Sequence, residues 1–255
     1  MKTSKKARPI KSDETLIQII DVVMDTGEAT ITEIAEEVGK TKSTVYFHLS
    51  TLEQYGYVVK SENGYRLGLK FLDVGILARE SQPLYPAVKP KVKELAKQTE
   101  EKSWCMVEEH GELIYLYGAE GEHPVRTHAR IGLRKPIHSL ASGKAILAHV
   151  EEDRLEKILN HHGLPKMTEN TTSDREEFYK ELEAVRERGM AFNLEESTIG
   201  MRAVAAPIKK ENGGVHGAIS VSGPAKRLPR ELLENDLGQL VQGAANELEI
   251  NLRYD

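Results

Sequence analysis

Apolar side chains recur three or four residues apart at several places in the first 60 residues, and this spacing places them on one face of a helix. The first run covers residues 16–23, and we expect Ser12 to cap its helix and Gly27 to end it. The second run follows Thr30 and Glu33, which have the spacing of a capping box. The pattern therefore predicts two helices, of which the second is short.

A third helix is predicted to begin after Thr41, a suitable N-cap, and to continue towards Gly56. Val45, Leu49 and Leu52 form its apolar stripe. The opposite face carries basic, hydroxyl and aromatic side chains: Lys42, Ser43, Tyr46, Phe47 and Ser50, with Thr44 at its edge. A surface helix more often carries pairs of Glu and Lys there, so this face has the character of a binding surface.

Two short β-type runs, residues 57–60 and 65–67, flank a turn that contains Asn63 and Gly64. Asn-Gly tolerates the positive φ angles of a type I′ turn and strongly favours a hairpin. Three helices with a tight second connection, followed by a hairpin, predict a winged helix-turn-helix.

The remaining pattern predicts a linker and a second domain. Residues 69–81 indicate a connecting helix, and prolines at 83, 86 and 90 place a boundary near residue 82. We expect a basic flexible tail at 1–11, a winged helix-turn-helix at 12–68, a linker helix at 69–82 and a second domain at 83–255.

Helices and strands are mixed in the second domain. A helix is expected to end near Lys102, and a hairpin to turn at His110 and Gly111. Further strands are predicted at 125–131, 190–195, 201–209 and 215–222, and further helices at 142–149, 152–161, 174–188 and 229–252. Paired strands separated by helices favour an α+β fold with an antiparallel sheet.

Composition limits the class of protein. The chain of 255 residues is 39% hydrophobic and 29% charged, which fits two packed domains and opposes wholesale disorder. No apolar run approaches the length of a membrane span and no signal-peptide core is present. Cys105 is the single cysteine, so a disulfide framework and a thiolate zinc cluster are excluded. We expect a soluble, cytoplasmic protein.

Charge is unevenly distributed near the N-terminus. Residues 1–11 carry five basic and no acidic side chains, residues 12–39 carry eight acidic and no basic ones, and residues 40–70 carry five basic and two acidic ones. Positive charge is thus confined to the tail and to the third helix with its hairpin. The acidic run is interpreted as a solvated face.

Catalytic and metal motifs are not evident. Gly143 and Lys144 lack the upstream glycine and the following Ser or Thr of a phosphate loop, and Leu140 stands where a nucleophile elbow around Ser142 needs glycine. His123, His128 and His138 could converge, but the histidine spacings do not match a helical zinc site. The sequence therefore predicts neither an enzyme nor a cofactor.

Several strings resemble the IclR-type transcriptional regulators. They are residues 41–52 with Gly56-Tyr57-Val58, residues 65–68, the string HSLASGKAILA at 138–148, and residues 200–207 through 218–224. The resemblance covers about residues 10–253, and the wording of residues 89–111 is most similar to archaeal members. It implies a GAF-like C-terminal sensor domain and an assembly as homodimers or dimers of dimers.

In a helix-turn-helix, the third helix enters the major groove of double-stranded DNA. Lys42 can contact a phosphate or guanine, Ser43 and Thr44 can donate to phosphate or base, and Tyr46 or Phe47 can touch a thymine methyl. Core packing is the alternative for Tyr46 and Phe47. His48 either reads a base or flanks the core. Lys60 and Arg66 border the hairpin, where a cation meets the DNA backbone or a minor groove.

The resemblance also implies an effector cup. Carried over by position, its residues are Ala141, Ser142, Asn193, Met201, Ala203, Ser220 and Ser222. Backbone N–H groups of Ala141 and Ser142 suit a carboxylate at a helix entrance, and Ser220 and Ser222 share one strand face or bond only locally. Asn193 replaces an acid and Ala203 a cysteine that are common in the family, which leaves sugar, keto and aromatic acids open.

The resulting hypothesis is a regulator that binds a palindromic operator as a symmetric oligomer and changes its DNA affinity when a small metabolite, a carboxylate, occupies the cup. Repression and activation are both open. The alternatives are an enzyme with an appended DNA-binding module and an architectural DNA-binder without a ligand.

Overall fold

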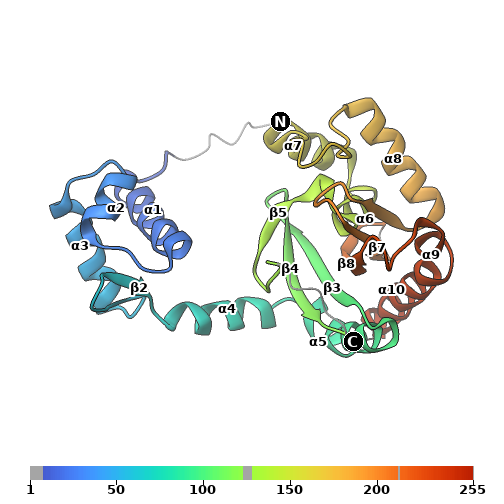
Figure 1. The fold of residues 1–255 in the computed structure, drawn as a ribbon, viewed down its shortest axis with the longest axis horizontal. Coiled ribbons are helices and arrows are strands. Elements are labelled where there is room, and N and C mark those ends of the chain that lie inside the picture. The colour runs from blue at the N-terminus through green and yellow to red at the C-terminus, as the bar shows by residue number, and fades with distance from the viewer. Residues whose placement is uncertain (1–7, 123–127, 212, 255) are drawn as a thin grey trace. The chain divides into compact units, whose positions relative to one another are not determined.

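A computed structural model describes residues 8–122, 128–211 and 213–254. Contacts within the chain divide it into two compact units, Met1–Ala78 and Arg79–Asp255. Each unit is described by itself, and the ribbon in Figure 1 shows the elements of both.

The first unit contains α1 (Lys11–Thr26), α2 (Ile31–Glu37), α3 (Lys42–Gln54), β1 (Val58–Lys60) and β2 (Tyr65–Leu67), and α4 (Lys70–Glu80) crosses the boundary into the second unit. Its core is built from the predicted apolar stripes, including Ile19, Val23, Ile34, Val45 and Leu49. This confirms the predicted helix-turn-helix with wing strands.

Two of the three N-caps predicted from the sequence are present. Thr30 and Glu33 form the predicted capping box, and Thr41 Oγ1 accepts from Thr44 N. The cap predicted at Ser12 is wrong, because α1 begins two residues earlier than predicted, with Ile10 at the N-cap. The Ile10 carbonyl accepts from the backbone N–H groups of Asp13 and Glu14, so Ser12 lies inside the first turn.

The wing turn also differs from its prediction. The strands end at the pair Lys60 and Tyr65, so four residues connect them rather than the two of a type I′ turn. Gly64 has φ +148°, and a Cβ there would overlap the Ala29 carbonyl. Ala29 and Tyr65 exchange backbone hydrogen bonds of 3.0 and 2.8 Å, so the turn shape follows from a contact with the segment after α1.

The second unit has a six-stranded antiparallel sheet in the order β5-β4-β3-β8-β7-β6. Its strands are β3 (Lys102–Glu109), β4 (Glu112–Ala119), β5 (Arg134–Pro136), β6 (Ala191–Leu194), β7 (Met201–Lys209) and β8 (Val215–Pro224). His110 and Gly111, with φ of 56° and 86°, form the predicted tight turn between β3 and β4. The predicted α+β class is confirmed.

Helices cover both faces of this sheet (Figure 1). One face packs on α5 (Leu84–Thr99), α9 (Arg230–Glu234) and α10 (Asp236–Tyr254). The other packs on α6 (Ala141–Leu147), α7 (Glu152–His162) and α8 (Arg175–Arg188), with a 3-10 turn at Ile137–Ser139 before α6. Ile219 and Val221 of β8 belong to the first core, while Ala218 belongs to the second. This alternation directs Ser220 and Ser222 to the α6 face.

Three predictions in this unit need correction. The strand expected at 125–131 falls partly on residues 123–127, outside the described residues, and residues 128–131 are not a strand; the edge strand β5 lies at 134–136 instead. The helix expected to reach Lys102 ends at Thr99, because Lys102 begins β3. The C-terminal helix is two helices separated at Asn235. Among the described residues, no helix is long and apolar enough to cross a membrane.

Candidate functional sites

The exposed face of α3 carries the residues predicted to contact DNA. Tyr46 is 51% exposed and Phe47 66% exposed, and their rings meet edge to face with centroids 5.9 Å apart. Core packing is therefore wrong as an explanation of either ring. Lys42 and Ser43 are also exposed, and His48 is partly buried. An exposed aromatic pair has no packing role within its own unit and suits a contact with a partner.

Thr44 differs from its neighbours on α3. Its Oγ1 lies 2.9 Å from Thr41 Oγ1, and its backbone N–H donates to the same atom. The hydroxyl thus takes part in the helix cap, which reduces its freedom to reach a base or a phosphate.

The wing presents two exposed cations. Val59 pairs with Arg66 and Lys60 pairs with Tyr65 across the strands, and consecutive residues point to opposite faces, so Lys60 and Arg66 lie on opposite faces of the ribbon. Within the described part of the chain, Lys42, Lys60 and Arg66 form no ion pair. Their charges are therefore available to phosphates.

A cavity of about 440 Å³ lies in the second unit between the sheet and the segment that enters α6. The seven predicted effector residues all line it: Ala141, Ser142, Asn193, Met201, Ala203, Ser220 and Ser222. The volume falls in the range of small-molecule sites. Effector binding by these residues stays a prediction.

Gly143 explains how closely α6 approaches the cavity wall. A Cβ at this helical position would overlap the Ile137 carbonyl oxygen. A glycine is therefore required for the helix to lie against the 3-10 turn, and this contact places Ala141 and Ser142 in the cavity lining.

The polar side chains of the cavity differ in how well they are satisfied. Ser142 is 2% exposed, and its Oγ has no hydrogen-bond partner among the described residues. Ser220 Oγ donates weakly to the Trp104 carbonyl at 3.5 Å. Both ends of the Asn193 amide bond within a turn, since its Oδ1 accepts from Glu196 N at 2.9 Å and its Nδ2 donates to Ser197 Oγ at 2.6 Å. A buried, unpartnered hydroxyl is costly, and a ligand would satisfy it.

Charge in the cavity is of one sign. Lys102, Lys135 and Arg202 lie in the lining, and the lining as described contains no aspartate or glutamate. Lys102 Nζ pairs with Glu120 at 2.8 Å, and Arg202 Nη2 pairs with Glu195 at 3.1 Å. Arg202 Nε is buried and has no acceptor in the described part of the chain.

Sequence reasoning missed the aromatic and cationic part of this lining. Trp104 and Tyr115 stack edge to face with centroids 4.9 Å apart, and they line the cavity with Met106, Lys102 and Lys135. Burial raises the pKa of Tyr115 to about 12, so its phenol stays neutral. Alternation along the hairpin of β3 and β4 could have indicated that Trp104, Met106 and Tyr115 share a face.

The described histidines do not assemble a metal site. Among the described residues, no group of three or more His, Cys, Asp or Glu could hold a metal ion, and His123 lies outside them. His138 Nε2 donates to the Pro165 carbonyl at 2.9 Å, and burial lowers the pKa of this imidazole. His128 lies in the cavity lining instead.

A winged helix-turn-helix joined to a domain with a cavity of small-molecule size defines the class of ligand-responsive transcriptional regulators. The family model described as "Bacterial transcriptional regulator IclR C-terminal" matches residues 77–250, and one described as "Bacterial regulatory protein, arsR family" matches residues 13–60. The chain belongs to the IclR family and is a DNA-binding transcriptional regulator with an effector-binding C-terminal domain.

Individual relatives agree along nearly the whole chain. The probable HTH-type transcriptional regulator ArcR of Halobacterium salinarum is 32% identical over 249 residues, 96% of this chain and 95% of that protein. The IclR of Thermotoga maritima has the same fold, with a TM-score of 0.78 and 28% identity over 95% of this chain and 98% of that one.

An IclR homologue from Microbacterium hydrocarbonoxydans, solved with 4-hydroxybenzoate, has a TM-score of 0.77 at 23% identity over 94% of this chain and 100% of that one. This likeness shows the fold. The named relatives are regulators rather than enzymes, so the enzymatic alternative is not supported.

Proposed function

We propose that this regulator binds a palindromic operator as a homodimer or a dimer of dimers, and that a small carboxylate in the cavity controls its operator affinity. The observation that carries the proposal is the charge of the cavity lining, where Lys102, Lys135 and Arg202 surround a space of about 440 Å³ and no carboxylate belongs to the lining as described. Glu120 and Glu195 pair with two of these cations from outside the lining, and Lys135 has no ion pair with the described residues. Such a lining favours an anion, and the neutral amide of Asn193 adds no opposing charge.

The aromatic wall favours a ligand with an apolar body. Its large apolar side chains include Trp104, Met106, Tyr115, Leu133 and Leu140. The Microbacterium hydrocarbonoxydans homologue was solved with 4-hydroxybenzoate, which combines a carboxylate with an aromatic ring. Aromatic, keto and sugar acids are the classes to be tested.

Helix α4 supports the proposed assembly. It exposes Leu72, Val74, Ile76 and Leu77 together with the preceding Leu69, and none of its residues is buried in the described chain. A helix with this much exposed apolar surface is stable when a second copy covers it. Because α4 leads from the wing strands into the second unit, we propose that it carries the coupling between cavity and DNA.

The DNA-binding part of the proposal places α3 in the major groove, with Lys42, Ser43, Tyr46 and Phe47 against the duplex and Lys60 and Arg66 against the backbone. His48 and Thr44 lie at the margin of this surface. The protein acts in the cytoplasm, and the effector selects between two arrangements of differing DNA affinity.

Gel retardation with the intergenic DNA upstream of the protein's own gene tests this interface. Changing Lys42 and Arg66 together to alanine is expected to weaken binding at least tenfold and to flatten the salt dependence, because each lost phosphate contact removes about 0.9 from the slope. The exposed Lys180 of the second unit, changed to alanine, is the matched control. Equal retention of DNA by the double variant would refute the assignment.

The effector is tested by thermal shift with aromatic, keto and sugar acids, because a ligand that binds only the folded state raises the melting temperature. Trp104 is the single tryptophan of the chain and lies in the cavity lining, so its fluorescence reports occupancy directly. If no acid changes either signal while DNA binding persists, the architectural alternative is the better account.

A further inference from the structure

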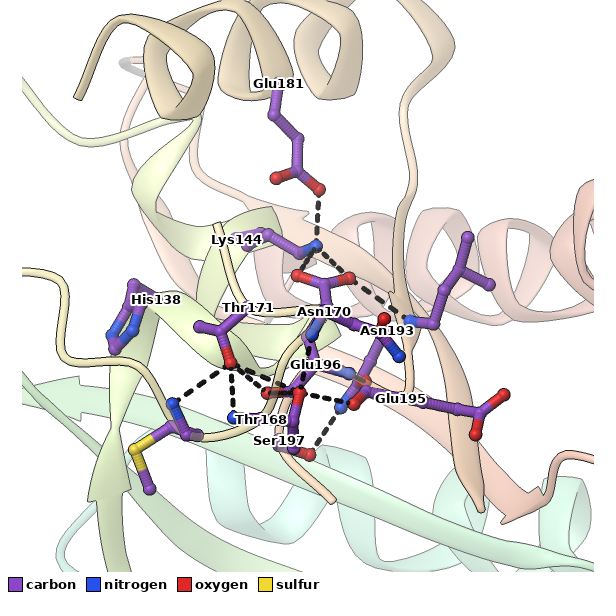
Figure 2. A network of polar contacts seen from close by, with 12 residues as sticks. His138, Lys144, Thr168, Asn170, Thr171, Glu181, Asn193, Glu195, Glu196 and Ser197 are labelled. Atoms are coloured by element: carbon purple, nitrogen blue, oxygen red, sulfur yellow. Dashed lines mark hydrogen bonds and ion pairs between the residues drawn. The ribbon is translucent and has the colours of Figure 1, made fainter. Parts of the chain in front are cut away.

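A chain of polar contacts links the buried Lys144 to Ser197 (Figure 2), a residue of the cavity lining. It begins at Lys144 on α6 and ends at Ser197, in the loop between β6 and β7. Ser197 and Thr198 line the cavity. The residues along the chain were not part of the effector set predicted from sequence, except for Asn193.

Lys144 is the fixed end of this chain. Its side chain is fully buried, and its Nζ lies 2.7 Å from both carboxylate oxygens of Glu196 and contacts Glu181 as well. A buried ammonium needs such partners, because leaving water is otherwise very costly. The contact therefore determines where the Glu196 side chain lies.

Further hydrogen bonds hold the Glu196 backbone and side chain. Thr171 Oγ1 donates to the Glu196 carbonyl at 2.6 Å, and Glu196 Oε1 accepts from Leu194 N at 3.1 Å. Glu195, immediately before it, adopts φ +68°. This reversal of the chain aims the Glu196 N–H at Asn193, 2.9 Å from its Oδ1 (Figure 2).

The direction of each hydrogen bond follows from this arrangement. A backbone N–H can only donate, so the Asn193 atom that faces Glu196 must be the carbonyl oxygen. The other end of the amide is then Nδ2, which donates to Ser197 Oγ at 2.6 Å. Ser197 Oγ uses a lone pair there, and its own O–H keeps no acceptor among the described residues.

We propose that Ser197 is a specificity-determining residue of the effector cavity, which Asn193 holds as a hydrogen-bond donor towards an anionic ligand. The inference rests on the proposed function, since it names a donor for the carboxylate assigned to that cavity. Asn193 is a positioning residue because it acts through Ser197.

An aspartate at position 193 would reverse the polarity. Asn193→Asp retains an acceptor for the Glu196 N–H but has no N–H for Ser197, so the hydroxyl must donate to the new carboxylate. Ser197 then presents only lone pairs to the cavity. An acid, which is common in the family at this position, therefore suits a different ligand group from the amide found here.

Trp104 fluorescence titrations of the full-length protein test the proposal. The probes are pyruvate, gluconate and 4-hydroxybenzoate, and the one with the strongest effect is compared with its amide. Ser197→Ala is expected to weaken the carboxylate about tenfold, as for a lost hydrogen bond to a charged group, and to change the amide less. Ser173→Ala, at an exposed serine outside the cavity lining, is the control for loss of a serine.

A double-mutant cycle tests whether Asn193 acts through Ser197, which we call the relay, or whether an aspartate at position 193 simply repels the ligand by its charge. In the Asn193→Asp background, Ser197→Ala is expected to cost no carboxylate affinity, because the hydroxyl no longer faces the ligand as a donor. Additive losses would overturn the proposal, since they mean that the aspartate acts through its charge alone.

A measurement without ligand distinguishes failure of the proposed carboxylate effector from failure of the proposed Asn193–Ser197 contact. In protein labelled with 15N at asparagine, the side-chain amide signal of Asn193 is identified by its loss in Asn193→Asp. Ser197→Ala is expected to shift that signal, and an unchanged signal overturns the relay whatever binds. A shifted signal with no fluorescence response to any acid would instead refute the proposed carboxylate effector and, with it, the role of Ser197 as its donor.

Discussion

Helices α3 and α6 each carry a lysine and a serine but place them in opposite environments. Helix α3 exposes Lys42, Tyr46 and Phe47 to solvent, whereas every residue of α6 is buried, Lys144 included. The difference matches the size of the partner. A DNA duplex is read by side chains that project from the surface, while a small ligand must be surrounded by groups that are already in place.

Lys42 and Lys144 therefore differ in the desolvation free energy that folding costs them. Lys42 keeps its hydration, and its charge is available at little expense to the fold. Lys144 has lost its water, and its interaction with Glu181 and Glu196 must compensate for that loss. Burial raises the pKa of Glu196, and the Lys144 ammonium opposes this shift. We expect the first lysine to matter for binding and the second for stability.

Lys144→Met should have the largest effect on stability. Removal of the ammonium leaves the Glu196 carboxylate buried and unpaired, which is expected to lower the free energy of unfolding by about 3–5 kcal/mol. Chemical denaturation measures the change. Lys42→Met, at an exposed position, should stay within about 0.5 kcal/mol of the wild type. Equal losses in the two variants would remove the contrast between the helices.

Phe47→Ala is expected to weaken operator binding about tenfold, or about 1.4 kcal/mol, because the ring contributes an apolar contact to the duplex. The 66% exposure of Phe47 means that the unfolding free energy should hardly change. Gel retardation and denaturation of the same preparation give both values. A stability loss of several kcal/mol would show that the ring packs within the unit after all.

Ser142→Ala tests the unpartnered hydroxyl of α6. Loss of a buried polar atom without a partner is expected to leave stability unchanged or to raise it by about 1 kcal/mol, while a carboxylate that bonds to this hydroxyl binds more weakly. Thermal unfolding and Trp104 fluorescence are the measurements. A clear drop in stability would indicate that the hydroxyl is already satisfied in the free protein.

The smallest effect is expected from pH. Burial lowers the pKa of His138, so below about pH 6.5 the unfolded chain takes up a proton that the folded chain does not. The stability contributed by the neutral ring is thus present above that pH and lost as the pH falls. His138→Gln retains an N–H for the Pro165 carbonyl and should show a shallower decline in melting temperature towards acid. An unchanged decline would assign it to other groups.

Local patterns predicted the first unit well. The capping box of Thr30 and Glu33 and the stripe of Val45, Leu49 and Leu52 depend on neighbours three or four residues away, so they are legible in a short window of sequence. The predicted type of the wing turn was wrong because Gly64 packs against the Ala29 carbonyl, which is distant along the chain. Non-local contacts of this kind override turn preference.

The cavity was predictable in part. Alternation placed Ser220 and Ser222 on one face, and motif positions indicated Ala141, Asn193 and Met201, all of which line the cavity. The burial of Lys144 was not predicted, because lysine is almost never fully buried. Its partners, Glu181 and Glu196, are 37 and 52 residues further along the chain, and no spacing rule connects them.

The order of amino acids alone indicated the type of protein through its motifs, and it predicted most of the helices and the face of α3 that we propose for DNA, because motifs and helix periodicity are properties of short segments. Tertiary structure alone decided which groups close the cavity and which of them keep an unused donor, as in Ser142 and Ser197. The reason is that burial and hydrogen-bond direction depend on atoms brought together from β3, α6 and β7, and only the folded chain makes them neighbours.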